Sequence, residues 1–484
     1  MCVLFSVFHG HQLVLSTERS ILNSSMRTAA KNFILLSSSE LLSKTLGFLT
    51  TVVIARRAGV NGLGDIGFVL AVYTYFAIIA NPGYDTIGVR ESAKREHDSS
   101  FIINSLFVLK FWSSILAFLM LVLFCLLVPF SSSVKQLLML QGLTLLTIPF
   151  SFQFYYRGDN QMHIVALSRF LQSSVYFLAV YFGVRGIGDL TRVPLSFGAA
   201  TILGLFPMAG LLRQHLNLRQ LIPWERLRTF FFSAITVGAA AICIQVYLNM
   251  DTVLLGFFKT NREVGLYTSA YKIVTLASTI PTLLFASYLP YLASLKNAPV
   301  KEWKTFVLTM FIIGLPTGII IALYAPEFIT ILYGPAYEGA VVPLRLLSID
   351  IIVIFISVTF AQPLLLLGKE KKYLSIAAWS AGLNLFLNLF LIPLYGMTGA
   401  ALTTIFAETL VAVLSWKALI LEVPLTFRKE VVSIITIGVV ALMILGLCLF
   451  LFSLSVKISG ITFIASYGIL IMRWYWKEKQ RNEK

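Results

Sequence analysis

The chain alternates between long apolar stretches and short polar segments. A helix needs about 20 largely apolar residues to cross the hydrocarbon core of a bilayer. Stretches of at least this length without any Asp, Glu, Lys or Arg occupy residues 111–134, 136–156, 193–212, 229–250, 273–295, 305–326, 373–407 and 431–456. The stretch 373–407 is long enough for two helices, and a Pro and a Gly within residues 392–396 divide it. Weaker stretches with a few charges lie at 33–54, 66–84, 163–183, 340–362 and 458–474. Together these stretches predict about fourteen transmembrane helices.

The composition supports an all-α membrane protein with many spans. Of the 484 residues, 58% are apolar and 12% are charged, whereas a soluble domain carries about 25% charged residues. Such a chain could not hide its apolar surface from water, which excludes a soluble enzyme, a secreted disulfide scaffold and a disordered chain. The four cysteines share no local spacing and the five histidines form no metal-binding motif, so no metal site is predicted.

Basic residues predict which side of the membrane each loop faces. With the amino terminus in the cytoplasm, most Lys and Arg residues fall in cytoplasmic loops, as the positive-inside rule requires. Both termini are then cytoplasmic, as a segment at 1–31 and a basic tail at 476–484, and a start at Met26 is an alternative. The formal net charge of +16 therefore indicates contact with the cytoplasmic leaflet, and no nucleic-acid partner is predicted.

A pair of similar segments indicates an internal repeat. Residues 58–68 follow the first predicted span and resemble residues 259–267 after the seventh span, with Gly64 matching Gly265. A repeat of six spans gives both halves the same orientation, and transporters often place the substrate path between such halves. We therefore predict an N-lobe with helices 1–6 at 32–212, a cytoplasmic linker at 213–228, a C-lobe with helices 7–12 at 229–420, and helices 13 and 14 at 431–475.

Several basic residues lie within the predicted spans, where a charge costs roughly 2.5–3.5 kcal/mol and usually faces a cavity or a partner. They come from both predicted lobes: Lys44, Arg169, Lys272 and Arg345. We expect them to line a central aqueous path, where positive groups favour an anionic group such as a phosphate diester or pyrophosphate. Two outer loops at equivalent places in the repeats carry more basic residues, which could hold the same group or simply anchor the interface: Arg56, Arg57, Lys259 and Arg262.

Acidic residues within the spans are candidate sites for coupling to H⁺ or Na⁺, and no other cofactor is predicted. These residues are Glu40, Asp251, Asp350 and Glu408. Glu40 precedes Lys44 by four positions, so the two could also neutralise each other on one helix face. Predicted helix 11 carries a polar ribbon that could equally join helices by hydrogen bonds. This ribbon consists of Ser380, Asn384 and Asn388.

Four segments around these residues resemble the multidrug/oligosaccharidyl-lipid/polysaccharide (MOP) exporter superfamily. The segments are GYDTIGVRE at 83–91, DTVLLG at 251–256, EVGLYTSAYK at 263–272 and LGKEK at 367–371. Within the superfamily, the chain resembles the polysaccharide-transport branch, which includes the O-antigen and repeat-unit flippases. The resemblance implies a V-shaped pair of helical lobes around a central cavity, and transport without catalysis.

The same resemblance implies a cargo and a location. The cargo would be a polyprenyl-(pyro)phosphate-linked oligosaccharide, moved by alternating access from the inner to the outer leaflet of the cell (inner, cytoplasmic) membrane. Membrane lipid, a polysaccharide polymerase and glycosyltransferases are the implied partners. Aromatic residues near the cavity helices could stack on sugar faces, although core packing would explain them equally. They are Tyr73, Tyr75, Tyr267, Tyr271 and Trp379.

Other functions remain open at the level of sequence. A cation-coupled drug or metabolite antiporter of the same superfamily would use the acidic residues of the spans rather than the basic ones. An integral-membrane glycosyltransferase would need a larger external loop than any predicted in this chain. A scaffold without transport would not need charges inside the membrane. The sequence contains no phosphate-binding glycine motif, which argues against direct use of ATP.

Overall fold

The computed structural model describes residues 2–94, 99–210, 223–292, 300–421 and 465–473, with side-chain environments from Ser38 onward except at 240, 289–292, 300–302 and 304. All regular elements in these ranges are helices. In chain order they are α1 (Cys2–Ala80), α2 (Tyr84–Lys94), α3 (Ser99–Leu127), α4 (Ser132–Gly142), η1 (Leu143–Phe150), α5 (Gln153–Gly158), α6 (Met162–Gly183), η2 (Ile187–Asp189), α7 (Arg192–Gly204), η3 (Phe206–Met208), α9 (Trp224–Phe258), α10 (Asn261–Ala277), α11 (Thr279–Leu292), α12 (Val300–Leu323), α13 (Ala325–Leu332), η4 (Pro335–Ala340), α14 (Val341–Leu366) and α15 (Glu370–Ile420).

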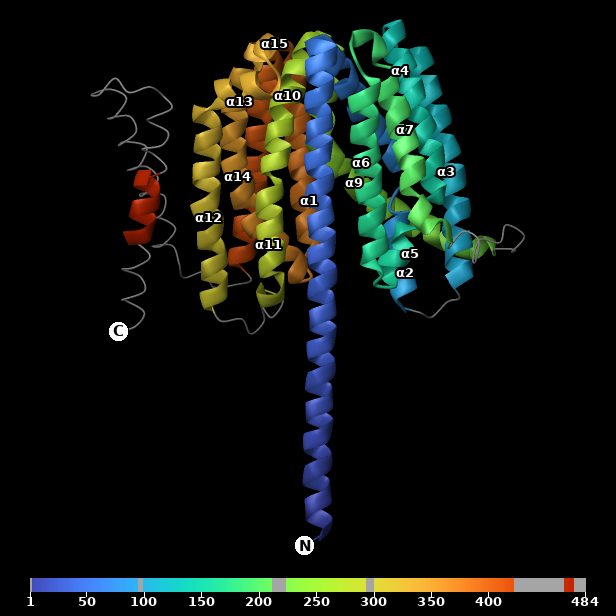
Figure 1. Cartoon of the computed structure of the whole chain (residues 1–484), viewed down its shortest axis with the longest axis vertical. Coiled ribbons are helices and arrows are strands. Elements are labelled where there is room, and N and C mark those ends of the chain that lie inside the picture. Colours follow the sequence, from blue (N-terminus) through green and yellow to red (C-terminus); the bar gives the residue numbers. More distant parts are fainter. Residues whose placement is uncertain (1, 95–98, 211–222, 293–299, 422–464, 474–484) are drawn as a thin grey trace.

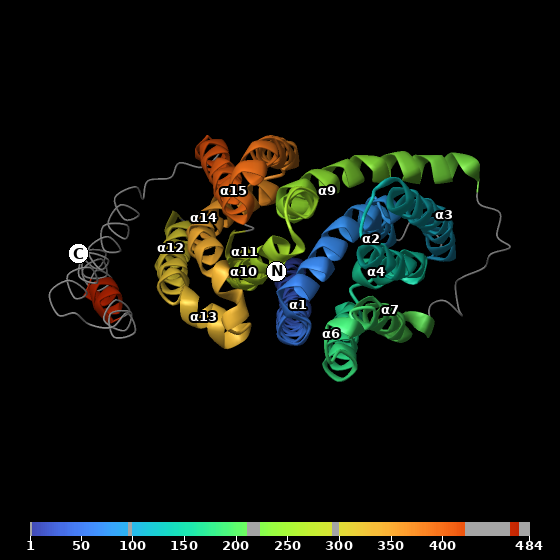
Figure 2. The same cartoon turned by 90° about the horizontal axis from the view of Figure 1, so that it is seen from above.

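The helices form two lobes, with α1 between them (Figures 1 and 2). We call α1 to η3 the N-lobe and α9 to α15 the C-lobe. Helix α1 packs against α6 of its own lobe and against α9 and α10 of the C-lobe. Within the C-lobe, α14 packs against α12 and α15, and α15 packs against α9. The chain therefore has the all-α, two-lobed architecture that its sequence predicts, while the residue numbers proposed for the lobe boundaries remain predictions.

Two of the long helices each contain a sharp break at a glycine. Gly59 in α1 has φ 72° and ψ −176°, and Gly396 in α15 has φ 55° and ψ −134°. A positive φ is readily adopted only by glycine, so each break depends on the residue type. Each of these helices therefore comprises two spans, and the break at Gly396 lies in the turn predicted at 392–396.

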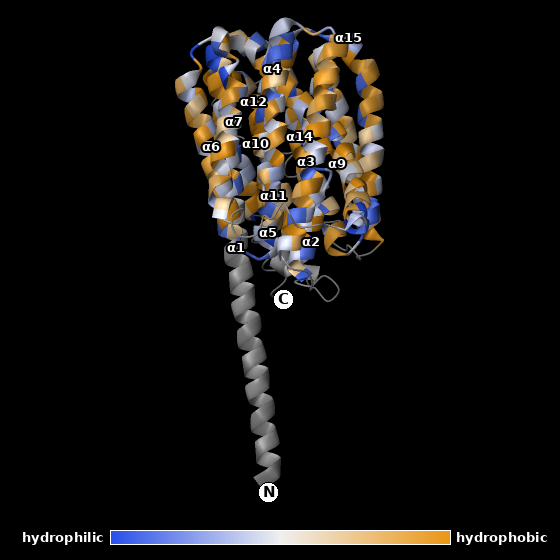
Figure 3. Cartoon of the chain, turned by 90° about the vertical axis from the view of Figure 1, so that its right-hand side faces the viewer, coloured by the Kyte–Doolittle hydropathy of each residue, from blue (hydrophilic) through white to orange (hydrophobic). Residues whose placement is uncertain are grey.

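The lengths and surfaces of the helices fit a bilayer. Among the described residues, eight helices are long and apolar enough to cross a membrane. Many large apolar side chains are exposed, as expected where lipid replaces water as the solvent. Hydrophobic residues occupy much of the length of the helices (Figure 3). Of predicted helices 13 and 14, residues 431–464 fall outside the described residues. Residues 465–473 are helical, and the Tyr467 hydroxyl donates a hydrogen bond to the Ile312 carbonyl at 3.4 Å.

The two repeats meet at one end of the bundle through equivalent glycines. A Cβ atom on Gly64 would lie 1.9 Å from the Asn261 carbonyl oxygen, and one on Gly265 would lie 2.0 Å from the Val60 carbonyl oxygen. Gly64 thus packs on Asn261, which lies four positions before Gly265. Gly265 packs in the same way on Val60, four positions before Gly64. Small residues allow such backbone contact between membrane helices. We call this contact the glycine crossing; it closes the lobes against each other at this end.

Polar contacts between the lobes reinforce the glycine crossing. The Asn261 side-chain amide donates to the Asp65 carboxylate at 2.5 Å, and the Tyr337 hydroxyl donates to the Ala55 carbonyl at 3.1 Å. Helix α10 begins beside this contact, where the Thr260 hydroxyl accepts a hydrogen bond from the Glu263 N–H at 3.3 Å and caps the helix.

Substitution of Gly64 by Val should open this end of the bundle. Overpacking a tight contact costs about 1–3 kcal/mol, so the population with separated lobes should rise by about tenfold. The measurement is the rate at which a membrane-impermeant maleimide labels Thr275→Cys, a cavity position, in a variant without other cysteines. Gly188→Val is the matched control, because a Cβ on Gly188 has no neighbour within 4 Å. Equal labelling in the Gly64→Val and Gly188→Val variants would contradict a gating role for the crossing.

Candidate functional site

A central cavity of about 660 Å³ lies between the two lobes. Both halves of α1 form one wall, and α6, α9, α10, α11, α14 and α15 contribute the rest of the lining. Hydroxyl groups are frequent on its surface, which includes Thr50, Thr51, Thr74, Thr252, Thr268 and Thr275. Polar groups at bilayer depth are costly unless they face water, a partner or a ligand. The cavity is therefore the principal candidate for a transport site.

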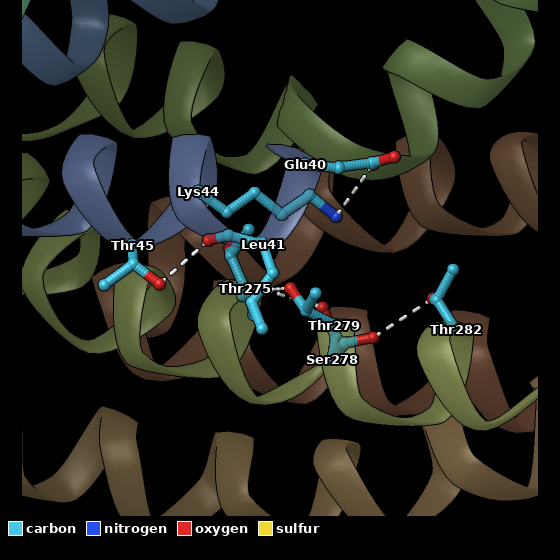
Figure 4. A network of polar contacts seen from close by, with 8 residues as sticks. All are labelled: Glu40, Leu41, Lys44, Thr45, Thr275, Ser278, Thr279 and Thr282. Atoms are coloured by element: carbon cyan, nitrogen blue, oxygen red, sulfur yellow. Dashed lines mark hydrogen bonds and ion pairs between the residues drawn. The ribbon is translucent and has the colours of Figure 1, made fainter. Parts of the chain in front are cut away.

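Two predicted cations line the central cavity, one from each lobe. Lys44 lies on α1 and Lys272 on α10. The Lys44 ammonium is 3.5 Å from a Glu40 carboxylate oxygen, and both side chains are more than a third exposed, so solvent weakens this pair. Figure 4 shows the pair beside hydroxyl groups of α10 and α11, of which Thr275 and Thr282 also line the cavity.

The other two predicted cavity cations lie elsewhere. Arg345 is exposed in the first turns of α14 and is not among the residues that line the central cavity. It precedes Asp350 by five residues, which places the two about 140° apart around a helix, and Asp350 is the one that faces the cavity. Arg169 is half-buried on α6, where its carbonyl accepts a hydrogen bond from Ser43, and it does not line the cavity either. Of the four predicted cavity cations, Lys44 and Lys272 line the central cavity, and a role of these residues in binding remains a prediction.

Three of the four predicted carboxylates gather in the C-lobe wall of the cavity. Asp350 and Glu408 line the cavity, and Asp251 lies directly behind Thr404, another lining residue. The Thr404 hydroxyl donates to an Asp251 carboxylate oxygen at 3.2 Å, and the Tyr267 hydroxyl donates to the same oxygen. The fourth carboxylate, Glu40, pairs with Lys44 instead.

The buried acids are only partly satisfied by protein groups. One carboxylate oxygen of Asp251 and one of Asp350 are buried without a hydrogen-bond partner. Ser357 donates to Glu408. Burying a polar group without a partner costs free energy, so these oxygens are suited to hold a cation or a proton.

The polar ribbon of α15 has mixed roles. The Ser380 hydroxyl donates to the Ala407 carbonyl at 2.8 Å and so joins the two halves of α15, as the structural interpretation predicts. The Asn388 amide donates to the Asn384 side-chain carbonyl at 3.0 Å, and both residues are fully buried. The Asn384 amide nitrogen and the Asn388 side-chain oxygen have no hydrogen-bond partner.

Two of the four basic residues in the predicted outer loops cap helix ends. Arg56 donates to the carbonyls of Leu332 at 2.8 Å and Ile331, the last residues of α13. Arg57 donates to the Val184 carbonyl at 2.7 Å at the end of α6. Cations stabilise the carboxyl ends of helices, where backbone carbonyls lack partners.

The remaining two outer-loop residues differ from each other. Lys259 donates to the Pro393 carbonyl at 2.9 Å, close to the break in α15. Arg262 is exposed. Three of the four basic residues therefore bind carbonyl groups, which supports anchoring rather than an open anion site.

The predicted sugar-stacking residues occupy different environments. Tyr271 lines the central cavity. Tyr267 is fully buried against Asp251. The Tyr75 hydroxyl donates to the Gln245 carbonyl at 3.1 Å, and Trp379 is 70% exposed on the outside of the bundle. Tyr73 lines a second cavity, of about 350 Å³, inside the N-lobe.

A buried ion pair that the sequence pattern does not predict lies beside this second cavity. Lys110 of α3 is fully buried, and its ammonium is 2.5 Å from an Asp85 carboxylate oxygen and 2.9 Å from the Ser151 carbonyl. It also lies 4.8 Å from the centre of the Phe154 ring. The Asn81 amide donates to the second Asp85 oxygen at 2.8 Å. The available signal was a single lysine in the interior of an otherwise apolar helix.

Comparisons with known proteins agree with this architecture. The model of the family "Polysaccharide biosynthesis protein" matches residues 29–296. A probable flippase, AglR, from Haloferax volcanii is 27% identical to this chain. The similar region covers 54% of this chain and 56% of the length of AglR. A putative O-antigen transporter from Escherichia coli is 22% identical over 81% of the chain and 96% of its own length.

Solved structures share the fold. The lipid II flippase MurJ in an inward closed conformation gives a TM-score of 0.77 at 14% identity, covering 92% of this chain and 99% of that chain. An inward-facing multidrug resistance transporter of the MATE family gives a TM-score of 0.59 at 14% identity. The match covers 77% of this chain and 93% of the transporter.

The two lobes and the polar cavity between them have the fold of solved transporters, among them a member of the MOP superfamily. The chain belongs to the polysaccharide biosynthesis protein family, and its relatives include a probable flippase and a putative O-antigen transporter. It is accordingly a multi-pass membrane protein.

Substitution of Lys110 by Met should destabilise the N-lobe, because it leaves the Asp85 carboxylate without its charge partner. Removing one member of a buried pair costs 3–5 kcal/mol, and we expect about 3 kcal/mol because Asp85 is partly exposed. The measurement is the Tm of the purified protein in detergent. The double variant Lys110→Met/Asp85→Asn should recover most of the loss. A single Lys110→Met variant as stable as the parent would show that the pair is unimportant for the fold.

Proposed function

We propose that the protein is a flippase for a polyprenyl-(pyro)phosphate-linked oligosaccharide, such as an O-antigen or another polysaccharide repeat unit. It moves this cargo from the inner to the outer leaflet of the cytoplasmic membrane by alternating access, with both termini in the cytoplasm. The observation that carries the proposal is the central cavity, where a lysine from each lobe meets a wall of hydroxyl groups. The family and the flippases among its relatives support the choice of cargo.

The chemistry of the cavity suits such a cargo. A headgroup of sugars and phosphates cannot cross hydrocarbon unaided, whereas its polyprenyl tail can stay in the lipid. Lys44 and Lys272 supply positive charge on both sides of the path, and charge-assisted hydrogen bonds to phosphate are stronger than neutral ones. The glycine crossing closes one end of the path, as alternating access requires of each resting state. Glycosyltransferases that build the cargo and a polymerase that consumes it are the partners that this function implies.

Neutralising the cavity lysines tests the proposal. A hydrogen bond to a charged group contributes roughly 1.5–3 kcal/mol, so Lys44→Gln and Lys272→Gln should each slow flipping by about 10- to 100-fold. The assay follows a fluorescent polyprenyl-pyrophosphate oligosaccharide in proteoliposomes, together with surface polysaccharide in cells at matched protein levels. The Lys44→Gln variant also leaves the Glu40 carboxylate without its partner. The double variant Glu40→Gln/Lys44→Gln removes both charges, so comparison of the two variants isolates the effect of losing the lysine.

Lys417→Gln is the matched control, because Lys417 is exposed at the end of α15. Its flipping rate should equal that of the parent. Parental rates in both cavity variants would remove the proposal.

We also propose that H⁺ or Na⁺ movement drives the cycle through the C-lobe acids. Asp350 and Glu408 share the cavity wall with Lys272, so a cation bound or lost there changes the charge that the cargo meets. A cation-coupled drug or metabolite antiporter is the second candidate function, because the same acids could bind an organic cation directly.

Removing these charges distinguishes the two functions. Asp350→Asn and Glu408→Gln should abolish the response of flipping to an imposed H⁺ or Na⁺ gradient, while flipping down a cargo gradient persists. Gradient-dependent flux is measured in proteoliposomes, with Glu338→Gln, an exposed residue of η4, as control. Transport of an organic cation, without flipping of the lipid-linked cargo, would favour the antiporter.

A further inference from the structure

The N-lobe contains a second polar cavity that the proposed phosphate capture does not use. It has a volume of about 350 Å³, within the range of small-molecule sites. Parts of α1, η1, α6 and α7 surround it. Thr74 of α1 lines both this cavity and the central one, so the two cavities adjoin.

The wall of the N-lobe cavity is rich in uncharged hydrogen-bonding groups. The Gln172 amide donates to the Thr201 hydroxyl at 3.0 Å, and the hydroxyls of Thr144 and Tyr73 are 3.0 Å apart. The side-chain oxygen of Asn81, another lining residue, is buried without a partner. Helices that only pack together do not need so many amides and hydroxyls around an open volume, because each is costly at this depth.

The cavity has no net charge to offer a ligand. Asp85 is the only Asp, Glu, Lys, Arg or His residue among those that line the cavity. Its carboxylate forms an ion pair with Lys110, which does not line the cavity. The site therefore suits neither a phosphate nor an organic cation. Two aromatic rings, Tyr73 and Phe197, line the cavity with their centres 6.3 Å apart. Hydroxyls, amides and aromatic faces without net charge are the groups that complement a neutral sugar.

We propose that the N-lobe cavity binds neutral sugar residues of the cargo while the central lysines hold its phosphate. This inference rests on the proposed flippase function and assigns the sugar-binding part of the path. The two cavities then divide the cargo by chemistry: cations in the central cavity meet the anionic group, and the neutral polar lining meets the carbohydrate. Thr74 lies at the junction between them.

Binding of two lipid probes to the purified full-length chain tests the assignment. The probes are undecaprenyl pyrophosphate and the same lipid carrying an N-acetylglucosamine disaccharide. The test variant is Gln172→Leu/Thr201→Val, which removes both members of one hydrogen-bonded pair and so leaves neither of them orphaned. Thr236→Val is the control, because Thr236 is exposed on α9 and lines neither cavity.

The double variant should bind the glycosylated lipid about tenfold more weakly than the parent, while its affinity for the bare lipid and its Tm stay unchanged. Equal losses for both probes, no loss, or a parent that does not prefer the glycosylated lipid would overturn the assignment. A parent that binds neither probe would instead refute phosphate capture and the proposed function with it. The two kinds of failure are distinguishable, because the parent protein fails to bind undecaprenyl pyrophosphate only when phosphate capture itself is wrong.

Discussion

Hydrocarbon offers no hydrogen-bond partner to a polar group, so a polar group in this bundle is costly unless it pairs with another or faces a water-filled space. Lys110 follows the first course, enclosed by Asp85 and the Ser151 carbonyl. Lys272 follows the second and faces the central cavity. This constraint separates the charges that hold the fold together from those available for transport, and the latter define the functional surface.

The same constraint shapes the contact between the lobes. Lipid provides little driving force for helices to associate, so close packing and hydrogen bonds must do so. At the glycine crossing, Gly64 and Gly265 bring two backbones together, and the Asn261–Asp65 hydrogen bond lies beside them. A contact made of few, small groups can form and separate during a transport cycle. In the proposed alternating-access cycle, this contact would serve as the gate between the two halves.

The two cavities differ in their charge, and this difference connects the structure to its family. The central cavity presents lysines from both lobes and acids from the C-lobe, which gives it groups for an anion and for a coupling cation. The N-lobe cavity is polar and neutral. The proposed cargo contains both an anionic group and sugars, and the two cavities offer each of these groups a separate binding surface.

The sequence by itself determined the all-α class and the position of many of the long apolar helices among the described residues, such as the two parts of α15 on either side of the predicted turn at 392–396. These follow from local transfer free energies, which depend on each segment alone. Only the tertiary structure decided that Arg345 turns away from the cavity, that Arg56 caps α13, and that Lys110 binds Asp85. Hydropathy contains no information on the rotation of a helix about its axis or on its neighbours. Packing between distant segments fixes both, and with them the choice between a charge that is paired and one that remains free to bind a ligand.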